Sequence, residues 1–340
     1  MTVTEPTPIT TADPITATGP ASGAASAAPG GGEDRDATFA SIVRRLSKQS
    51  VEKHFDAYAD IDWDDPLMAI DPADPRFLLW TGDPLGATEW YRSQPADVQS
   101  RVALYRVASA MRTGWEFENV LQRGLLNIAF WMPNGAEQFR YLHHETIEES
   151  QHSLMFQEFV NRTGMPVHGM PTVIKKAAER AVLPLSRRFP ELFFLFVLGG
   201  EDPVDHLQRQ QLRRGGVHPL VERIMRIHVT EEARHVSYAR NYLKAEVPKL
   251  GRVRRGALSL ITPPMFGVMT RLMVDVPPSM SFRAGVPKSV ISEARKTPKR
   301  AKLLVEASAK PRKLCEELGL MNPVSRRLWK LFGVAGGPET

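Results

Sequence analysis

Two segments of the chain each carry a glutamate and a histidine three residues apart, at Glu149 and His152 and at Glu232 and His235. Both segments have the apolar spacing of amphipathic helices, and on a helix this separation places the two side chains on one face, about one turn apart. One such pair would be weak evidence, because these residue types occur at helical spacing by chance. Two facing helices that each carry a pair, with one more glutamate from each of two other helices, form the ligand set of dinuclear carboxylate bundles.

Both pairs are expected to point into the protein. The first pair shares its helix face with Met155 and Phe156, and the second shares its face with Met225 and Ala239. Burying unpaired charge is costly. Carboxylates and imidazoles at these positions therefore need a cation.

The second segment has an additional histidine, His228, four residues before Glu232. His228, Glu232 and His235 fall within an arc of about 60° on a helix, so all three can reach one site. Glu145 occupies the matching position in the first segment. His228 is therefore a candidate for an extra ligand.

A third ligand is expected from the preceding helix, which offers Glu116 and Glu118. Glu118 is in phase with Met111 and Leu121 on an apolar face. Glu116 is in phase with Arg112 on a polar face, where helix-surface ion pairs are enough to explain it. We choose Glu118 and keep Glu116 as the alternative.

The fourth helix offers Glu201, which follows a strongly apolar run and is in phase with Phe194 and Leu198. Asp205, about one turn later, is the alternative ligand, or else a hydrogen-bond acceptor for a histidine. Pro203 lies between them and is expected to kink or bulge the helix.

The predicted ligands are thus four glutamates and three histidines. They are Glu118, Glu149, His152, Glu201, His228, Glu232 and His235. Oxygen and imidazole ligands without thiolate suit iron, or alternatively manganese. Two such ions can bind and reduce dioxygen between them.

This arrangement resembles the p-aminobenzoate N-oxygenase (AurF-like) family of ferritin-like di-iron oxygenases, over residues 95–250. Glu148 stands where the family usually has aspartate. His228 is the feature that separates this family from acyl-carrier desaturases, ribonucleotide reductase small subunits and bacterioferritins. The motifs that carry the resemblance are Glu118 with Glu148-Glu149-x-x-His152, and Glu201 with His228-x-x-x-Glu232-x-x-His235.

The resemblance implies an enzyme that uses two iron ions and dioxygen to oxidise an amine, often an arylamine, through hydroxylamine and nitroso stages toward a nitro group. It also implies a homodimer. Electrons are expected from an external donor, because the chain has no G-x-G-x-x-G unit for flavin or nicotinamide. The alternatives are a fatty-acyl desaturase or hydroxylase, against which His228 argues, and an iron-binding bundle without enzyme activity.

The elements that position these residues are long helices. Between residues 94 and 250, amphipathic segments of about 25 to 35 residues are separated by clusters of Gly and Pro at MPNGAE, RTGMPVHGMP and RRGGVHP. Strand-type alternation is nearly absent. We therefore predict an all-α chain with a ferritin-like four-helix bundle core and additional flanking helices.

The chain is expected to have three regions. Residues 1–36, rich in Ala, Thr, Pro and Gly, are predicted to be disordered. Residues 37–285 form the ferritin-like di-iron oxygenase domain, with a loop-rich connection at 60–84 and an apolar helix that must bend or break at Pro263 and Pro264. Residues 286–340 form a basic helical extension packed on or beside the bundle.

Composition limits the setting. The net charge of the 340 residues is +6, and residues 286–332 hold twelve Lys or Arg against four Glu. Because this stretch has few aromatic residues and no nucleic-acid fold motif, we expect solvated helix faces and no nucleic-acid partner. A single cysteine, Cys315, no signal-peptide pattern and no apolar run long enough for a transmembrane segment favour the cytoplasm.

The substrate pocket is expected close to the predicted ligands. Arg112, Arg209 and several C-terminal arginines are all candidates for anchoring a carboxylate on the substrate, and spacing does not decide between them. The candidates for the apolar pocket wall are Trp115, Leu121, Phe194, Leu198 and Gly200.

Overall fold

The computed structural model describes residues 32–336, which contain thirteen α-helices and no β-strand. The all-α prediction is confirmed. The predicted disordered segment lies outside the described residues up to residue 31, whereas residues 32–36 already belong to the first helix, α1 (Gly32–Glu52). From Gly32 onward the chain forms one unit, with no division at residue 286.

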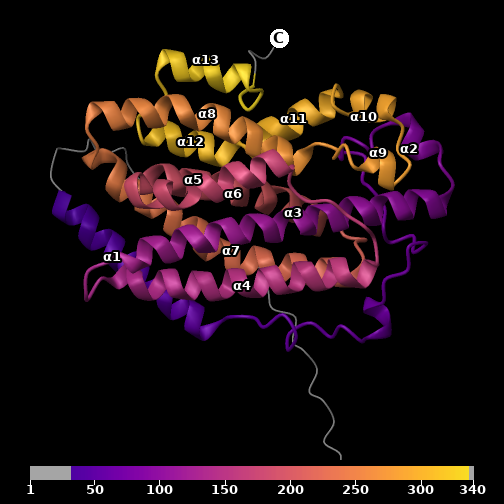
Figure 1. The fold of residues 1–340 in the computed structure, drawn as a ribbon, viewed down its shortest axis with the longest axis horizontal. Coiled ribbons are helices and arrows are strands. Elements are labelled where there is room, and N and C mark those ends of the chain that lie inside the picture. Colours follow the sequence, from indigo (N-terminus) through magenta and orange to yellow (C-terminus); the bar gives the residue numbers. More distant parts are fainter. Residues whose placement is uncertain (1–31, 337–340) are drawn as a thin grey trace, which may run out of the picture. The chain divides into compact units, whose positions relative to one another are not determined.

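Four long helices run alongside one another and form the core of this unit (Figure 1). They are α3 (Ala96–Phe130), α4 (Glu137–Thr163), α6 (Pro190–Arg214) and α7 (Pro219–Glu246), with 35, 27, 25 and 28 residues. α3 packs most extensively on α4, and α6 on α7. The lengths agree with the sequence-based prediction and suit a bundle with a site in its interior.

The helix ends follow from local chemistry. Gly164 ends α4 in the left-handed conformation with φ +60°, a backbone that only glycine adopts without strain. α7 begins with Pro219 at its first position, and the His218 side chain accepts a hydrogen bond from the Leu220 N–H. The three Gly- and Pro-rich clusters of the sequence thus lie in the loops that were predicted from them.

The remaining helices cover the bundle. α1 packs across α4 and α7, α5 (Thr172–Arg188) packs on α3 and α6, and α8 (Arg252–Val274) runs along α6. Between α1 and α2 (Glu89–Ser93) the chain has only the short 3₁₀ helix η1 (Pro66–Met68), as expected for a loop-rich connection. A second 3₁₀ turn, η2 (Val247–Lys249), follows α7.

α8 continues as one helix through Pro263 and Pro264, where a bend or a break was expected, so the break does not occur. The helix runs along the bundle (Figure 1). Packing against α6 and against α13 (Pro323–Leu331) offsets the cost of about 3 kcal/mol for a proline inside a helix. By length and hydropathy α8 is also the one described helix that could cross a membrane, but half of the qualifying window is buried, as in a core helix.

The basic C-terminal part consists of short helices, and three of them, α11 (Pro298–Ala307), α12 (Ala309–Glu317) and α13, pack on α6 or α8. Several of its cations are paired with the rest of the protein: Arg300 with Asp275 at 2.6 Å and Lys310 with Asp205 at 3.0 Å. The other two short helices are α9 (Met280–Arg283) and α10 (Lys288–Ala294).

Candidate metal centre

The four long helices bring all seven predicted ligands into one cluster. Each side chain is at most 2% exposed. Subsets of three or four of them have one potential ligand atom each, all within 4.8 Å of one another. α3 supplies Glu118, α4 supplies Glu149 and His152, α6 supplies Glu201, and α7 supplies His228, Glu232 and His235.

The two motif glutamates lie between the two motif histidines. The His152 Nδ1 atom is 3.1 Å from Glu149 Oε2 and 3.5 Å from Glu232 Oε1. The His235 Nδ1 atom is 3.0 Å from Glu232 Oε1 and 3.0 Å from Glu149 Oε1. Both imidazoles therefore direct Nδ1 at both carboxylates, so Glu149 and Glu232 can each reach an ion held by either histidine.

His228 completes the cluster on one side. Its Nε2 atom is 3.5 Å from Glu118 Oε1 and 3.8 Å from Glu232 Oε1. Its Nδ1 atom is 3.0 Å from Gln208 Oε1, a carbonyl oxygen that can only accept. This contact places the proton on Nδ1 and leaves the Nε2 lone pair directed at the cluster.

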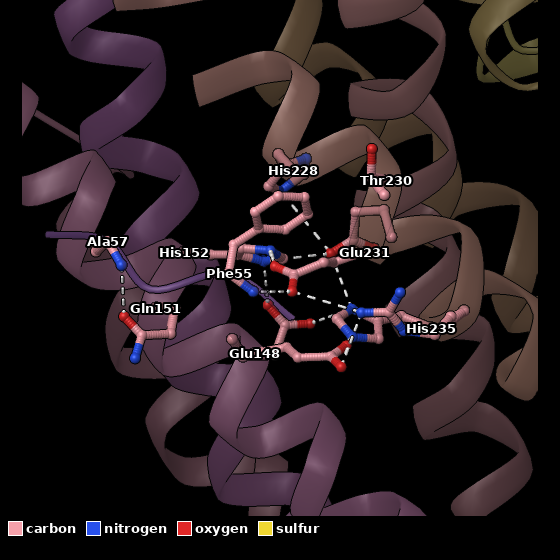
Figure 2. A network of polar contacts seen from close by, with 12 residues as sticks. Phe55, Ala57, Glu148, Gln151, His152, His228, Thr230, Glu231 and His235 are labelled. Atoms are coloured by element: carbon pink, nitrogen blue, oxygen red, sulfur yellow. Dashed lines mark hydrogen bonds and ion pairs between the residues drawn. The ribbon is translucent and has the colours of Figure 1, made fainter. Parts of the chain in front are cut away.

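Two more glutamates, which were not predicted as ligands, contact the outer nitrogen of each motif histidine. Glu231 Oε2 lies 2.9 Å from His152 Nε2, and Glu148 Oε2 lies 2.7 Å from His235 Nε2 (Figure 2). Each contact crosses between α4 and α7. A carboxylate on Nε2 holds the ring in place and leaves Nδ1 free for a metal. The sequence signal for these two contacts is the pair of adjacent glutamates, Glu148-Glu149 and Glu231-Glu232, at the start of each motif.

These outer carboxylates have partners of their own. Arg234 Nη2 lies 2.8 Å from Glu148 Oε1 and 3.4 Å from Glu231 Oε1. The backbone N–H of Phe55, in the loop after α1, donates to Glu231 Oε1 at 3.0 Å. The buried charges around the histidines are thus held by ion pairs with Arg234 and by a backbone hydrogen bond.

The electrostatics of the cluster call for cations. Burial, followed by the charge of Glu149, raises the pKa of Glu118 well above its usual range. Burial lowers the pKa of His228 well below its usual range, so this imidazole is neutral. For His152 burial acts downward, but hydrogen bonds to Glu149 and Glu231 outweigh it and raise the pKa to about 10. In the metal-free protein a proton thus sits where a metal would bind.

The donor set fits two metal ions. One oxygen each of Glu118, Glu201 and Glu232 is buried without a hydrogen-bond partner among the described residues. Unpartnered buried carboxylate oxygens are costly, and ions coordinated by them and by the imidazoles would remove that cost. Carboxylates and imidazoles without thiolate are the ligands that iron and manganese accept.

The two alternative carboxylates lie outside the cluster. Glu116 is 2.9 Å from Arg112 Nε and 2.6 Å from Lys175 Nζ, and it also accepts the N–H of Met170. Asp205 is 2.5 Å from Arg209 Nε and 3.0 Å from Lys310 Nζ. The charge of each carboxylate is balanced by cations of the protein, as expected for Glu116 from its position on a polar helix face.

Comparison with known proteins agrees with this geometry. The family model described as P-aminobenzoate N-oxygenase AurF matches residues 36–319. The chain belongs to the AurF family. Uncharacterized protein Mb0909 of Mycobacterium bovis and uncharacterized protein Rv0885 of Mycobacterium tuberculosis are each 39% identical to it over 306 residues, 89% of this chain and 90% of theirs. No solved structure matches the chain.

Membership confirms the resemblance and the ferritin-like fold. The AurF family is a family of di-iron oxygenases, so the buried glutamates and histidines of this chain belong to an oxidoreductase with a di-iron type of site. Such an enzyme acts on a small molecule with dioxygen.

A cavity of about 270 Å³ reaches the centre of this AurF-family chain from one side. It meets the cluster at Glu118, Glu201 and His228, whereas the other four predicted ligands do not line it. Its wall is mainly apolar and includes Phe77, Val107, Met111, Phe117, Phe156, Val221 and Met225. The centre is therefore open at the His228 end.

The predicted pocket wall is wrong, since none of its five residues lines the cavity. Leu121, Phe194 and Leu198 are fully buried in the hydrophobic core and do not reach the cavity. Trp115 packs under the Arg112 guanidinium, 4.3 Å from its ring centroid. The sequence gives the phase of a residue on its helix but does not show which end of the cluster is open. Neither Arg112 nor Arg209 lines this cavity, so neither can anchor a substrate within it.

Proposed function

We propose that this protein is a di-iron, dioxygen-dependent N-oxygenase that converts an amine, preferentially an arylamine, to a hydroxylamine, nitroso or nitro product. The observation that carries the proposal is the cavity that meets the buried cluster at Glu118, Glu201 and His228. It brings an apolar substrate to the same side chains that would hold the ions. Family membership supports the oxygenase chemistry.

The proposed ligands are the seven clustered residues, with two iron ions as the cofactor and manganese as the alternative metal. When bound, the ions would supply the reduction of dioxygen and the transfer of one oxygen atom to the amine nitrogen. The first oxidation consumes one dioxygen, two electrons and two protons per amine, and it releases one water with the hydroxylamine.

The protein's own part is to orient the ligands and to exclude water. Glu231 and Glu148 hold His152 and His235 through Nε2, so both rings keep Nδ1 toward the ions. Gln208 keeps the proton of His228 on Nδ1. A neutral Nε2 donor then faces the open side of the centre without adding charge there.

The cavity is suited to an aromatic substrate. An apolar cavity of about 150 Å³ is known to bind benzene, so about 270 Å³ has room for a substituted ring. Arg106, 8% exposed, lies in the wall with Asp83, its Nε 3.6 Å from Asp83 Oδ2 and its Nη2 bound to the Val274 carbonyl. The buried Arg106 Nε has no hydrogen-bond partner among the described residues, so it can donate to a polar substituent of the ring.

The proposal includes a cytoplasmic homodimer with an external electron donor. A buried free thiol at Cys315 fits a reducing compartment. The homodimer rests on the family resemblance alone.

The test begins with anaerobic loading of the full chain with ferrous iron and metal analysis. Two irons per chain are expected. After chemical reduction, exposure to ¹⁸O₂ with a panel of arylamines should yield hydroxylamine or nitro products that carry the label, as measured by mass spectrometry. His228→Ala should abolish labelling while the helical circular dichroism is retained.

His206→Ala is the matched control, because His206 lies on α6 outside the cluster and 3.9 Å from Glu306. It should retain full labelling. Failure to bind two irons contradicts the di-iron centre. Desaturated or C-hydroxylated products would favour the alternative enzymes, and accumulation of many irons per chain without any labelled product would favour iron storage.

A further inference from the structure

A second hollow, of about 420 Å³, lies on the surface between the C-terminal half of α6 and the N-terminal half of α7. Its wall contains five cations and no carboxylate, and it shares no residue with the cavity that reaches His228. The lining residues are Lys53, Phe55, Arg209, Leu212, Arg213, Arg223, Arg226, Ile227, Val229 and Thr230.

The positive charge of this hollow is only partly compensated. Three of its arginines have carboxylates nearby: Arg209 pairs with Asp205 at 2.5 Å, Arg226 with Glu222 at 2.6 Å and Arg223 with Asp60 at 3.8 Å. Lys53 and Arg213 are exposed and form no ion pair among the described residues. The hollow therefore keeps an excess of positive charge directed outward.

The hollow also lies at the end of a short path to the metal centre. Phe55 is part of its wall, and the Phe55 backbone N–H donates to Glu231 Oε1 at 3.0 Å. The other oxygen of Glu231 is 2.9 Å from Nε2 of His152, a proposed ligand (Figure 2). Two hydrogen bonds thus connect the basic surface to the centre, on a side that the substrate cavity does not use.

We propose that this hollow docks the acidic face of a one-electron carrier protein of the iron–sulfur type, which reduces the metal centre through Phe55, Glu231 and His152. The inference rests on the proposed function, because an oxygenase whose sequence has no G-x-G-x-x-G unit for flavin or nicotinamide is expected to take electrons from outside. Each encounter transfers one electron and leaves the carrier oxidised by one electron. Two encounters convert two ferric ions to two ferrous ions.

A protein partner fits this surface better than a small anion. A small anion would need several free donors that converge on one point, and three of the arginines are already engaged by carboxylates. Cations spread over two helices and a loop instead generate a field that steers an acidic surface and fixes its orientation. Such steering weakens as ionic strength rises.

The experiment uses an acidic [2Fe–2S] ferredoxin as the probe. Its affinity for the full-length chain without metal is measured by isothermal titration calorimetry at several salt concentrations. The double variant Lys53→Glu with Arg213→Glu should bind about tenfold more weakly at low salt and should show a flatter salt dependence. The matched control is Arg327→Glu with Lys330→Glu on α13, which changes the net charge equally at two exposed cations that have no ion pair among the described residues. It should bind like the unaltered chain.

A second readout is the rate at which reduced ferredoxin reduces the iron-loaded chain. The Lys53/Arg213 double variant should lower the second-order rate constant about tenfold, whereas reduction by a small uncharged hydroquinone should be unchanged. The proposal is overturned if ferredoxin does not bind the unaltered chain, if the control loses as much, or if the hydroquinone rate falls equally. Binding of an acidic acyl carrier protein without binding of ferredoxin would also overturn it.

The two proposals can fail separately. Ferredoxin binding needs neither metal nor substrate, so a bound carrier without amine oxidation would leave the docking surface and reject the N-oxygenase. Amine oxidation with a chemical reductant, together with ferredoxin binding that the charge reversal does not change, would support the N-oxygenase and reject the docking surface.

Discussion

The missing side chain of Gly200 makes room for an aromatic ring beside the metal centre, and adding a methyl group there is a sharp test of the packing. A Cβ built on Gly200 falls well inside 3.0 Å of the Phe117 ring, a separation that real Cβ atoms do not show. Phe117 precedes Glu118, and Gly200 precedes Glu201. Gly200→Ala must therefore move either the ring or the helices that carry two of the proposed ligands.

The magnitude follows from two opposing effects. Replacing glycine by alanine inside a helix stabilises by about 1 kcal/mol. Overpacking a well-filled core costs about 1–3 kcal/mol. Gly256, inside α8, has no heavy atom within 4 Å of the position that a Cβ would occupy. Gly256→Ala therefore has the stabilisation of alanine over glycine in a helix without the clash. The difference between the two variants should then be about 1–3 kcal/mol, because the helix effect cancels.

The assay is urea unfolding of both metal-free variants and the unaltered chain, followed by iron analysis after loading. Gly256→Ala should be as stable as the unaltered chain or more so, with two irons per chain. Gly200→Ala should be less stable than Gly256→Ala and should bind iron more weakly. If Phe117 escapes into the cavity, binding of an arylamine should weaken as well. Equal stability of the two variants with equal iron content would refute the packing described around the centre.

Three further outcomes are expected. Glu118→Ala should lower the iron content, whereas Glu116→Ala, which removes the partner of Lys175, should keep both irons and lose about 1–3 kcal/mol in urea unfolding. Since the pKa of His152 is about 10 in the metal-free protein against about 6.5 when unfolded, the stability that this group contributes is present below pH 6.5 and is lost toward pH 10. Metal loading at pH 7 should accordingly release protons, measurable by calorimetry in two buffers of different ionisation enthalpy. Asp205→Ala should leave the iron content unchanged and should speed hydrogen exchange in α12, which Lys310 ties to it.

The parts that the sequence predicted are those controlled locally. Helix boundaries follow from residues such as Gly164 and Pro219, whose backbone preferences act within a few positions. The inward phase of Glu118 and the ion pair of Glu116 with Arg112, four residues earlier, follow from helical spacing alone. The ligands on α4 and on α7 could be assigned to one site without knowing the distance between these helices, because both motifs repeat the same spacing.

The parts that were missed depend on how distant segments cross. Glu231 reaches His152 on another helix, and no spacing within α7 indicates that contact. The continuous helix through Pro263 and Pro264 depends on packing against α6 and α13, which outweighs the local cost of proline. The open end of the centre likewise depends on how the four helices cross.

His228 was predicted from the spacing of its motif, and it also lies at the open end of the centre. The two motif helices carry glutamate or histidine at four matched positions, and three of these have the same residue type in both helices. The fourth differs: α4 has Glu145 where α7 has His228. Glu145 is fully buried, burial raises its pKa to about 8, and it does not line the cavity. His228 lines the cavity and is kept neutral by burial. A neutral donor can border an apolar substrate site where an ionised carboxylate would be costly. Among these four matched positions, the one that differs is thus the one that lines the cavity.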